Sequence, residues 1–147
     1  MRRLLVIEDG DEYAEFARLF LGPDFQVRQA RSAAEALHAL ATEPPDVLLF
    51  DLRFDRTPAG TLVGDVRATS QRLFAGDEAR ALRYLQDQQG VLILGELRAA
   101  GHQQPAVFVH EFPTRRLDNL RRLYGAVTAL PGFDAAALRQ ALGGSPP

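Results

Sequence analysis

Three acidic residues stand where two apolar segments of the chain end. Residues 4–7 and 47–50 are short, fully apolar runs, which stop at Glu8 and Asp9 and at Asp51. Runs of this kind are typical of strands that are buried on both faces of a parallel sheet. Ligands of such sheets bind beyond the carboxyl ends of the strands, where the strand order reverses. We therefore expect the three carboxylates to meet in one pocket.

A pocket of this kind would attract a divalent cation, because converging carboxylates repel one another by about 4 kcal/mol per pair at about 4 Å and an effective dielectric constant near 20. The chain has no cysteine, and its three histidines show no metal-ligand spacing. Oxygen ligands alone favour Mg²⁺, which combines one or two carboxylates with water and phosphate oxygens. With such a cation, Asp51 is a candidate nucleophile toward a phosphoryl donor. The alternative is that the acidic strand ends are simply solvated.

The elements that would position these residues alternate along the chain. Apolar periodicity and capping signals predict helices over residues 11–21, 32–42, 90–100, 114–124 and 134–142. Besides the two runs above, strands are predicted over residues 25–30, 106–109 and 126–129. Strands joined by helical crossovers lie parallel. The prediction is therefore an α/β fold with a doubly wound, five-stranded parallel sheet in three layers.

Residues 54–89 interrupt this alternation. Residues 54–76 have weak periodicity and several turn formers, and we expect a loop there, followed by a helix over residues 77–85. Whether this helix continues into the next one stays open. We expect the segment to restrict access to the pocket or to supply a docking surface. Residues 56–88 should be removable without loss of the five-stranded fold. The predicted organisation is one domain over residues 1–142 with this insertion, and a flexible tail over residues 143–147.

Composition excludes several classes of function. A chain of 147 residues with a net charge of −2 fits one domain, and its charge balance argues against nucleic acid as a partner. No apolar run is long enough for a membrane span or a signal peptide, so we expect a cytoplasmic protein without a membrane partner. All 17 basic residues are arginine. A Schiff base, a phosphate-binding P-loop or any other mechanism that needs a lysine amine is therefore excluded.

The chain resembles the receiver domain of two-component response regulators over nearly its whole length. Residues 4–9, LLVIED, are similar to the first receiver strand with its acidic pair, and residues 46–52, DVLLFDL, to the third strand with its phosphoacceptor aspartate. Residues 90–101 resemble the third receiver helix, and residues 105–109 resemble the fourth strand. The resemblance implies that the doubly wound sheet is flavodoxin-like, and it implies a role in phosphorelay signal transduction.

For the site, the resemblance implies that Asp51 accepts the phosphoryl group. It implies a weakly bound Mg²⁺, with Glu8, Asp9, Asp51 and the backbone carbonyl of Arg53 as ligands. The implied partner is a histidine kinase or another signalling protein, and a homodimer is compatible with the family. No enzymatic activity is implied beyond phosphorylation and dephosphorylation of Asp51 itself.

Three positions depart from the family pattern where the receiver switch should be. His110 stands in place of the threonine or serine at the end of strand four, and Leu130 in place of the lysine at the end of strand five. Val127 replaces the aromatic residue that rotates inward. A switch from 1:99 to 99:1 needs about 5.5 kcal/mol, whereas one charge-assisted hydrogen bond supplies about 1.5–3 kcal/mol. The missing lysine and hydroxyl would account for roughly that amount.

Other side chains are candidates for the missing contacts. His110 could donate to a phosphoryl oxygen, or it could simply bond to the backbone, and Arg53 and Arg56 could supply the missing positive charge. The leading hypothesis is a stand-alone atypical receiver. The alternatives are a pseudo-receiver that docks proteins without phosphorylation and, third, a Mg²⁺-dependent phosphohydrolase, which would want an aspartate at the position of Arg53.

Overall fold

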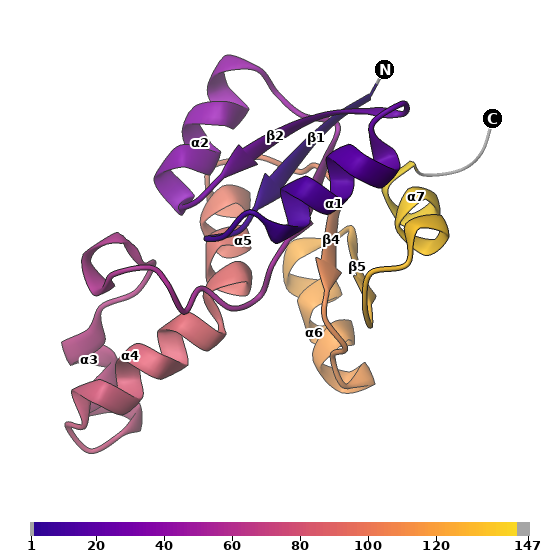
Figure 1. Cartoon of the computed structure of the whole chain (residues 1–147). Helices are drawn as coiled ribbons and strands as arrows, with labels where there is room; N and C mark the ends of the chain where they lie inside the picture. Colours follow the sequence, from indigo (N-terminus) through magenta and orange to yellow (C-terminus); the bar gives the residue numbers. More distant parts are fainter. Residues whose placement is uncertain (1, 144–147) are drawn as a thin grey trace.

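The computed structural model describes residues 2–143. Five parallel strands form one sheet in the order β2-β1-β3-β4-β5, and helices cover both of its faces (Figure 1). The predicted flavodoxin-like, doubly wound architecture is confirmed. The strands are β1 (Arg2–Ile7), β2 (Phe25–Ala30), β3 (Val47–Phe50), β4 (Ala106–Val109) and β5 (Val127–Leu130).

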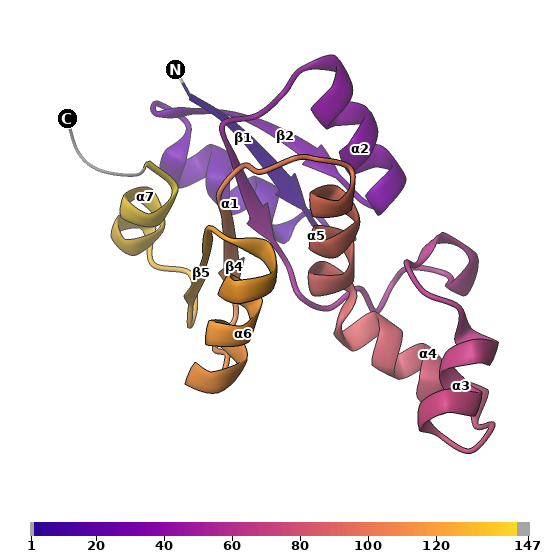
Figure 2. The same ribbon diagram turned by 180° about the vertical axis from the view of Figure 1, so that it is seen from behind.

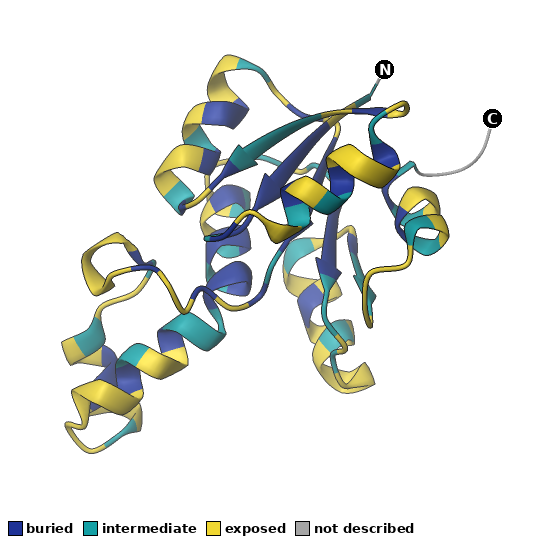
Figure 3. Cartoon of the chain, in the orientation of Figure 1, coloured by how far each residue is buried: buried dark blue, intermediate teal, exposed yellow. Residues whose placement is uncertain are grey.

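The two faces of the sheet carry separate hydrophobic cores. Side chains alternate across a strand, so Leu4 and Val6 face one layer while Leu5 and Ile7 face the other. The first layer is formed by α1 (Glu12–Leu21) and α7 (Ala135–Gly143). The second is formed by α2 (Ala33–Thr42), α5 (Gln89–Ala99) and α6 (Thr114–Tyr124). Figure 2 shows this second layer. In Figure 3 the central strand β3 is buried over its whole length, and its neighbours β1 and β4 are buried over most of theirs.

The insertion differs from its prediction in two respects. The segment predicted as a loop contains the short 3-10 helix Ala59–Thr61 and a full helix, α3 (Val66–Leu73), which Asp65 caps by accepting the backbone N–H of Ala68 at 2.8 Å. The pattern missed α3 because its buried side chains are Thr69 and Ser70 rather than apolar residues.

The helix predicted over residues 77–85 is α4 (Glu78–Asp87), and it does not run on into α5. Gln88 leaves helical geometry between them, with φ −108° and ψ 7°. Figures 1 and 2 both show α3 and α4 projecting away from the sheet. The insertion therefore leaves the domain at the end of β3 and rejoins it at the start of α5.

Gly90 explains why α5 can begin beside the end of β3. Its backbone N–H donates to the carbonyl oxygen of Leu52 at 2.9 Å. A Cβ atom at this position would collide with the carbonyl oxygen of Asp51. Only glycine permits so close an approach of the two backbones. The loop that carries Asp51 is thus braced by the first turn of α5.

The predicted tail over residues 143–147 lies outside the described residues except for Gly143, the last residue of α7.

Candidate functional site

The carboxyl ends of β1 and β3 lie side by side at the centre of the sheet. Ile7 pairs with Phe50, and the backbone N–H of Asp51 donates to the carbonyl oxygen of Ile7 at 3.0 Å. The chain leaves β1 toward β2 on one side and returns to β3 on the other, so the strand order reverses here. The acidic residues that follow these strands therefore occupy the point where doubly wound sheets bind ligands.

Glu8 is buried, with 1% of its surface exposed, and both carboxylate oxygens accept hydrogen bonds from the first turn of α1. Oε1 accepts the backbone N–H of Tyr13 at 3.1 Å, and Oε2 accepts that of Ala14 at 2.8 Å. Asp11, at the N-cap position, makes no such bond with its side chain. Glu8 is therefore the cap of α1. Burial raises the pKa of Glu8 to about 7 despite these bonds.

Asp51 is half-buried and keeps one oxygen free. Its Oδ1 accepts the Tyr13 hydroxyl at 3.4 Å and the backbone N–H of Arg53 at 3.3 Å. Its Oδ2 accepts no hydrogen bond from any residue between 2 and 143. Burial raises the pKa of Asp51 to about 6, and the negative charge of Asp9 acts in the same direction. An acceptor oxygen is thus held near a second carboxylate in partly desolvated surroundings.

Two residues of the insertion donate hydrogen bonds to the carboxylate of Asp9. Asp9 Oδ2 accepts the backbone N–H of Arg56 at 2.7 Å and the hydroxyl of Thr57 at 3.5 Å. The guanidinium of Arg56 turns instead to Glu12, with Nη2 2.8 Å from Oε1, and this bond lowers the pKa of Glu12 to about 2. The side chain of Arg56, a predicted phosphoryl contact, is therefore engaged with α1 while its backbone serves Asp9.

His110 directly follows β4, and Arg53 comes two residues after Asp51. Burial lowers the pKa of His110, and the positive charges of Arg53 and Arg116 lower it further. The imidazole packs edge-on against Phe112, with the ring centres 4.7 Å apart. Within the described chain, neither the imidazole nor the exposed guanidinium of Arg53 has a hydrogen-bond partner. The imidazole that follows β4, and a guanidinium near enough to lower its pKa, thus both keep their hydrogen-bonding groups unpaired within residues 2–143.

The two other departures from the family pattern offer Asp51 no polar side chain. Val127 is buried in the core between the sheet and α6, and its carbonyl oxygen accepts the Nε–H of Arg121 at 2.9 Å. Leu130 packs against the opposite core, on the side of α1 and α7.

For a metal, the structure offers two free carboxylate oxygens. No group of three or more His, Asp or Glu side chains in the described part of the chain is arranged to hold an ion. Both oxygens of Glu8 cap α1, whereas Asp9 Oδ1 and Asp51 Oδ2 accept no hydrogen bond from residues 2–143. Mg²⁺ takes one or two carboxylates and completes its shell with water and phosphate oxygens. Asp9 and Asp51 therefore fit this cation.

Two residues of the site were not singled out from the sequence. Tyr13 lies within the helix predicted over residues 11–21, and Thr57 within the loop predicted over residues 54–76. A signal for Tyr13 exists, because the first turn of a helix that directly follows a strand lies at the carboxyl edge of the sheet. Its hydroxyl keeps its proton, since burial and the nearby charge of Asp51 raise the pKa of Tyr13.

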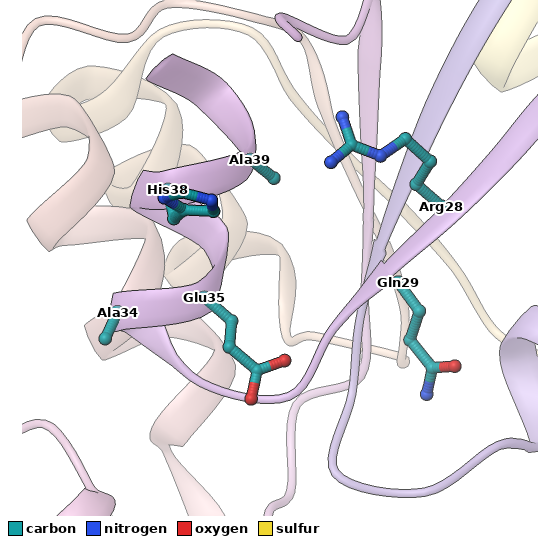
Figure 4. A pocket seen from close by; sticks show the side chains of 6 residues that line it. All are labelled: Arg28, Gln29, Ala34, Glu35, His38 and Ala39. Carbon is teal, nitrogen blue, oxygen red and sulfur yellow. The ribbon is translucent and has the colours of Figure 1, made fainter. Parts of the chain in front are cut away.

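A separate hollow of about 340 Å³ lies between the edge strand β2 and α2. Figure 4 shows Arg28 and Gln29 on the strand opposite Glu35 and His38 on the helix. Arg28 forms an ion pair with Glu43 at 3.4 Å, and Glu35 accepts the backbone N–H of Arg31 at 3.2 Å. This hollow is not part of the acidic site.

Comparison with solved structures identifies the fold. A two-component response regulator from Clostridium difficile superposes with a TM-score of 0.61 at 11% identity, covering 94% of this chain and 89% of that one. A response regulator receiver domain from Clostridium thermocellum gives 0.64 at 14% identity, over 97% and 92%. A CheY-like receiver domain from Methylobacillus flagellatus gives 0.60 at 21% identity, over 94% and 92%. The chain has the receiver-domain fold.

Sequence comparison adds one relative. The sensor histidine kinase TmoS of Ectopseudomonas mendocina is 36% identical over 69 residues, which are 47% of this chain and 7% of the kinase. No protein-family model matches the chain. No helix between residues 2 and 143 combines the length and the apolar character needed to cross a membrane. Within the receiver fold, the end of β1 carries Glu8 and Asp9, and the end of β3 carries Asp51.

Proposed function

We propose that this chain is an atypical receiver domain in a phosphorelay, in which Asp51 accepts a phosphoryl group and the signal passes on through protein contacts. The observation that carries the proposal is the free Oδ2 of a half-buried Asp51, beside Asp9, at the switch point of a receiver fold. The segment similar to a sensor histidine kinase supports a histidine kinase, or another protein of a two-component system, as the partner.

Mg²⁺ is the proposed cofactor, bound weakly by Asp9 and Asp51 with the backbone carbonyl of Arg53. When bound, it would neutralise negative charge on the transferring phosphoryl group. Glu8 contributes charge to the site and holds α1, because both of its oxygens are engaged. Arg53 and His110 are the proposed contacts of the phosphoryl oxygens, since neither side chain has a hydrogen-bond partner within residues 2–143.

In the proposed transfer, Asp51 Oδ2 attacks the phosphorus atom of the donor. A bond forms between this oxygen and phosphorus, and the bond from phosphorus to the leaving group breaks, with its electron pair departing on the leaving group. Asp51 then carries an acyl phosphate. A classical phosphohydrolase is not proposed, because Arg53 stands two residues after Asp51, where the haloacid-dehalogenase type has a second aspartate.

A pseudo-receiver is the second candidate. The observation that favours it is the absence of polar switch side chains at Val127 and Leu130, whose positions in the two cores offer nothing to a phosphoryl group. Such a protein would dock its partners whether or not Asp51 is modified.

The decisive experiment is incubation with Mg²⁺ and acetyl phosphate, followed by intact-mass measurement. We expect a mass gain of one phosphoryl group in the wild type, its loss in Asp51→Asn, and its retention in Asp55→Asn. Asp55 is a matched control, because it is an exposed aspartate close enough to raise the pKa of Asp51. No gain in the wild type, or an undiminished gain in Asp51→Asn, would overturn phosphorylation at Asp51 and leave the pseudo-receiver.

A further inference from the structure

The hydroxyl of Tyr13 lies between two acceptors that belong to different strands. Its Oη is 3.4 Å from Asp51 Oδ1 and 3.4 Å from the carbonyl oxygen of Val109. Asp51 follows β3, and Val109 is the last residue of β4, next to His110. A tyrosine hydroxyl has one proton and can donate it to one acceptor at a time. The two acceptors therefore compete for the same hydrogen bond.

The rest of Tyr13 is held in place. Its backbone N–H donates to Glu8 Oε1 at 3.1 Å, which fixes the start of α1. Its ring meets the ring of Phe133 edge-on, with centres 4.6 Å apart, and Phe133 also contacts Phe16 at 4.6 Å. Phe133 belongs to the segment between β5 and α7. With backbone and ring both anchored, rotation of the hydroxyl bond is the freedom that remains.

The charge on Asp51 decides which acceptor is favoured. A hydrogen bond to a carboxylate is roughly twice as strong as one to a neutral carbonyl group. In an acyl phosphate the negative charge lies on the phosphoryl oxygens, so Oδ1 becomes an oxygen of a neutral ester-like group. The carbonyl oxygen of Val109 is then the competitive acceptor.

We propose that Tyr13 is a positioning residue of the Asp51 site, whose hydroxyl holds Oδ1 while Asp51 is a carboxylate and turns to the Val109 carbonyl once that charge is removed. The first state leaves Oδ2 as the attacking oxygen. The second state tightens the end of β4, beside His110. The part of this inference that concerns phosphorylation rests on the proposed function, and the hydrogen-bond exchange itself does not.

The first test needs no phosphorylation. The carbonyl ¹³C resonance of Val109 is measured in the wild type and in Asp51→Asn, which replaces the carboxylate by a neutral amide of the same shape. We expect a downfield shift in Asp51→Asn, because the hydroxyl now donates to Val109. The shift should vanish when Tyr13→Phe is added, which keeps the ring, and persist when Tyr124→Phe is added. Tyr124 is a half-buried tyrosine on α6 whose hydroxyl has no partner in residues 2–143. An equal shift with and without the Tyr13 hydroxyl would overturn the inference.

The second test adds beryllofluoride and Mg²⁺, a mimic of the phosphoryl group. In the wild type we expect resonances of Asp51–Arg53, of His110 and of the Val109 carbonyl group to shift. In Tyr13→Phe we expect the shift of the Val109 carbonyl resonance to be lost, whereas His110, a proposed phosphoryl contact, still responds. A full response of the Val109 carbonyl resonance in Tyr13→Phe would contradict the role of Tyr13. If no adduct forms in either protein, the phosphoacceptor proposal fails, and the first test still decides the hydrogen-bond exchange.

Discussion

Two opposing effects act on the pKa of Glu8. As a carboxylate it accepts two backbone N–H groups and caps α1, which favours the ionised form. As a buried group beside Asp51 it avoids ionisation, and burial is the larger effect, raising its pKa to about 7. Glu8 therefore changes its protonation close to neutral pH.

The first prediction follows from this pKa. The ordinary value is 4.5 and the folded value about 7, so between these limits the folded protein holds a proton that the unfolded chain has released. Stability must then fall as the pH rises through this window. At about 1.4 kcal/mol per pKa unit, we expect a loss on the order of 1–3 kcal/mol from Glu8 between pH 5 and pH 8.

The measurement is urea unfolding at both pH values in the presence of EDTA. Asp51, whose pKa is raised from 3.8 to about 6, adds to the decline in the same direction. The control is Glu8→Gln, which cannot titrate and should show a smaller difference between the two pH values, whatever its absolute stability. Identical differences in the two proteins would show that Glu8 is not the titrating group.

At the scale of elements, the insertion is tied to the core at its base. Leu62 and Leu85 are buried in the same hydrophobic cluster as Phe50 and Ile93. The buried Gln89 side chain accepts the backbone N–H of Val63 at 2.7 Å and donates to its carbonyl oxygen at 3.2 Å. Deletion of residues 56–88, which we expected the fold to tolerate, would remove the buried side chains of Leu62 and Leu85 from the core.

The second prediction compares a buried leucine of the insertion, on α4, with an exposed one at the end of α3. Leu85→Ala should cost about 2–5 kcal/mol, because it removes a side chain that is 4% exposed from the shared core. Leu73→Ala, at the end of α3, should change stability by less than about 0.5 kcal/mol, because that side chain is 48% exposed. Equal losses in chemical unfolding would mean that the core extends to the tip of α3.

Across the whole molecule, the distribution of polar side chains limits how far a change at Asp51 can travel. The chain offers Tyr13 as a link to β4, but Val127 and Leu130 give β5 no polar side chain toward the site. Arg121, on α6, is committed to the carbonyl oxygen of Val127 and binds α6 to β5 instead.

The third prediction concerns this limit. When the beryllofluoride adduct forms, we expect hydrogen exchange to change at Asp9, Asp51–Arg56 and the end of β4, and to stay unchanged within α6 and β5. The physical reason is that Val127 and Leu130, at the two switch positions of β5, carry apolar side chains that pack against the two cores. Protection changes in α6 as large as those at Asp51 would show that the chain keeps a family-like switch by another route.

Much of the fold could be predicted because its signals are local. The apolar run before Asp51, the Ser32 cap that accepts the Glu35 N–H at 3.1 Å, and the Asp77 cap of α4 are each encoded within a few residues. α3 was missed because it buries Thr69 and Ser70 and so lacks the apolar period that marks a helix.

For the site, the sequence by itself determined which residues follow the strand ends, and hence that Glu8, Asp9 and Asp51 share one edge of the sheet. Only the tertiary structure decided that the Glu8 carboxylate accepts hydrogen bonds from the first turn of α1 and that the Arg56 guanidinium binds Glu12. The same holds for the Tyr13 hydroxyl, which lies between Asp51 and Val109. These contacts span 5 to 96 positions along the chain. Side-chain direction depends on neighbours brought together by packing, and no periodic pattern in the sequence encodes it.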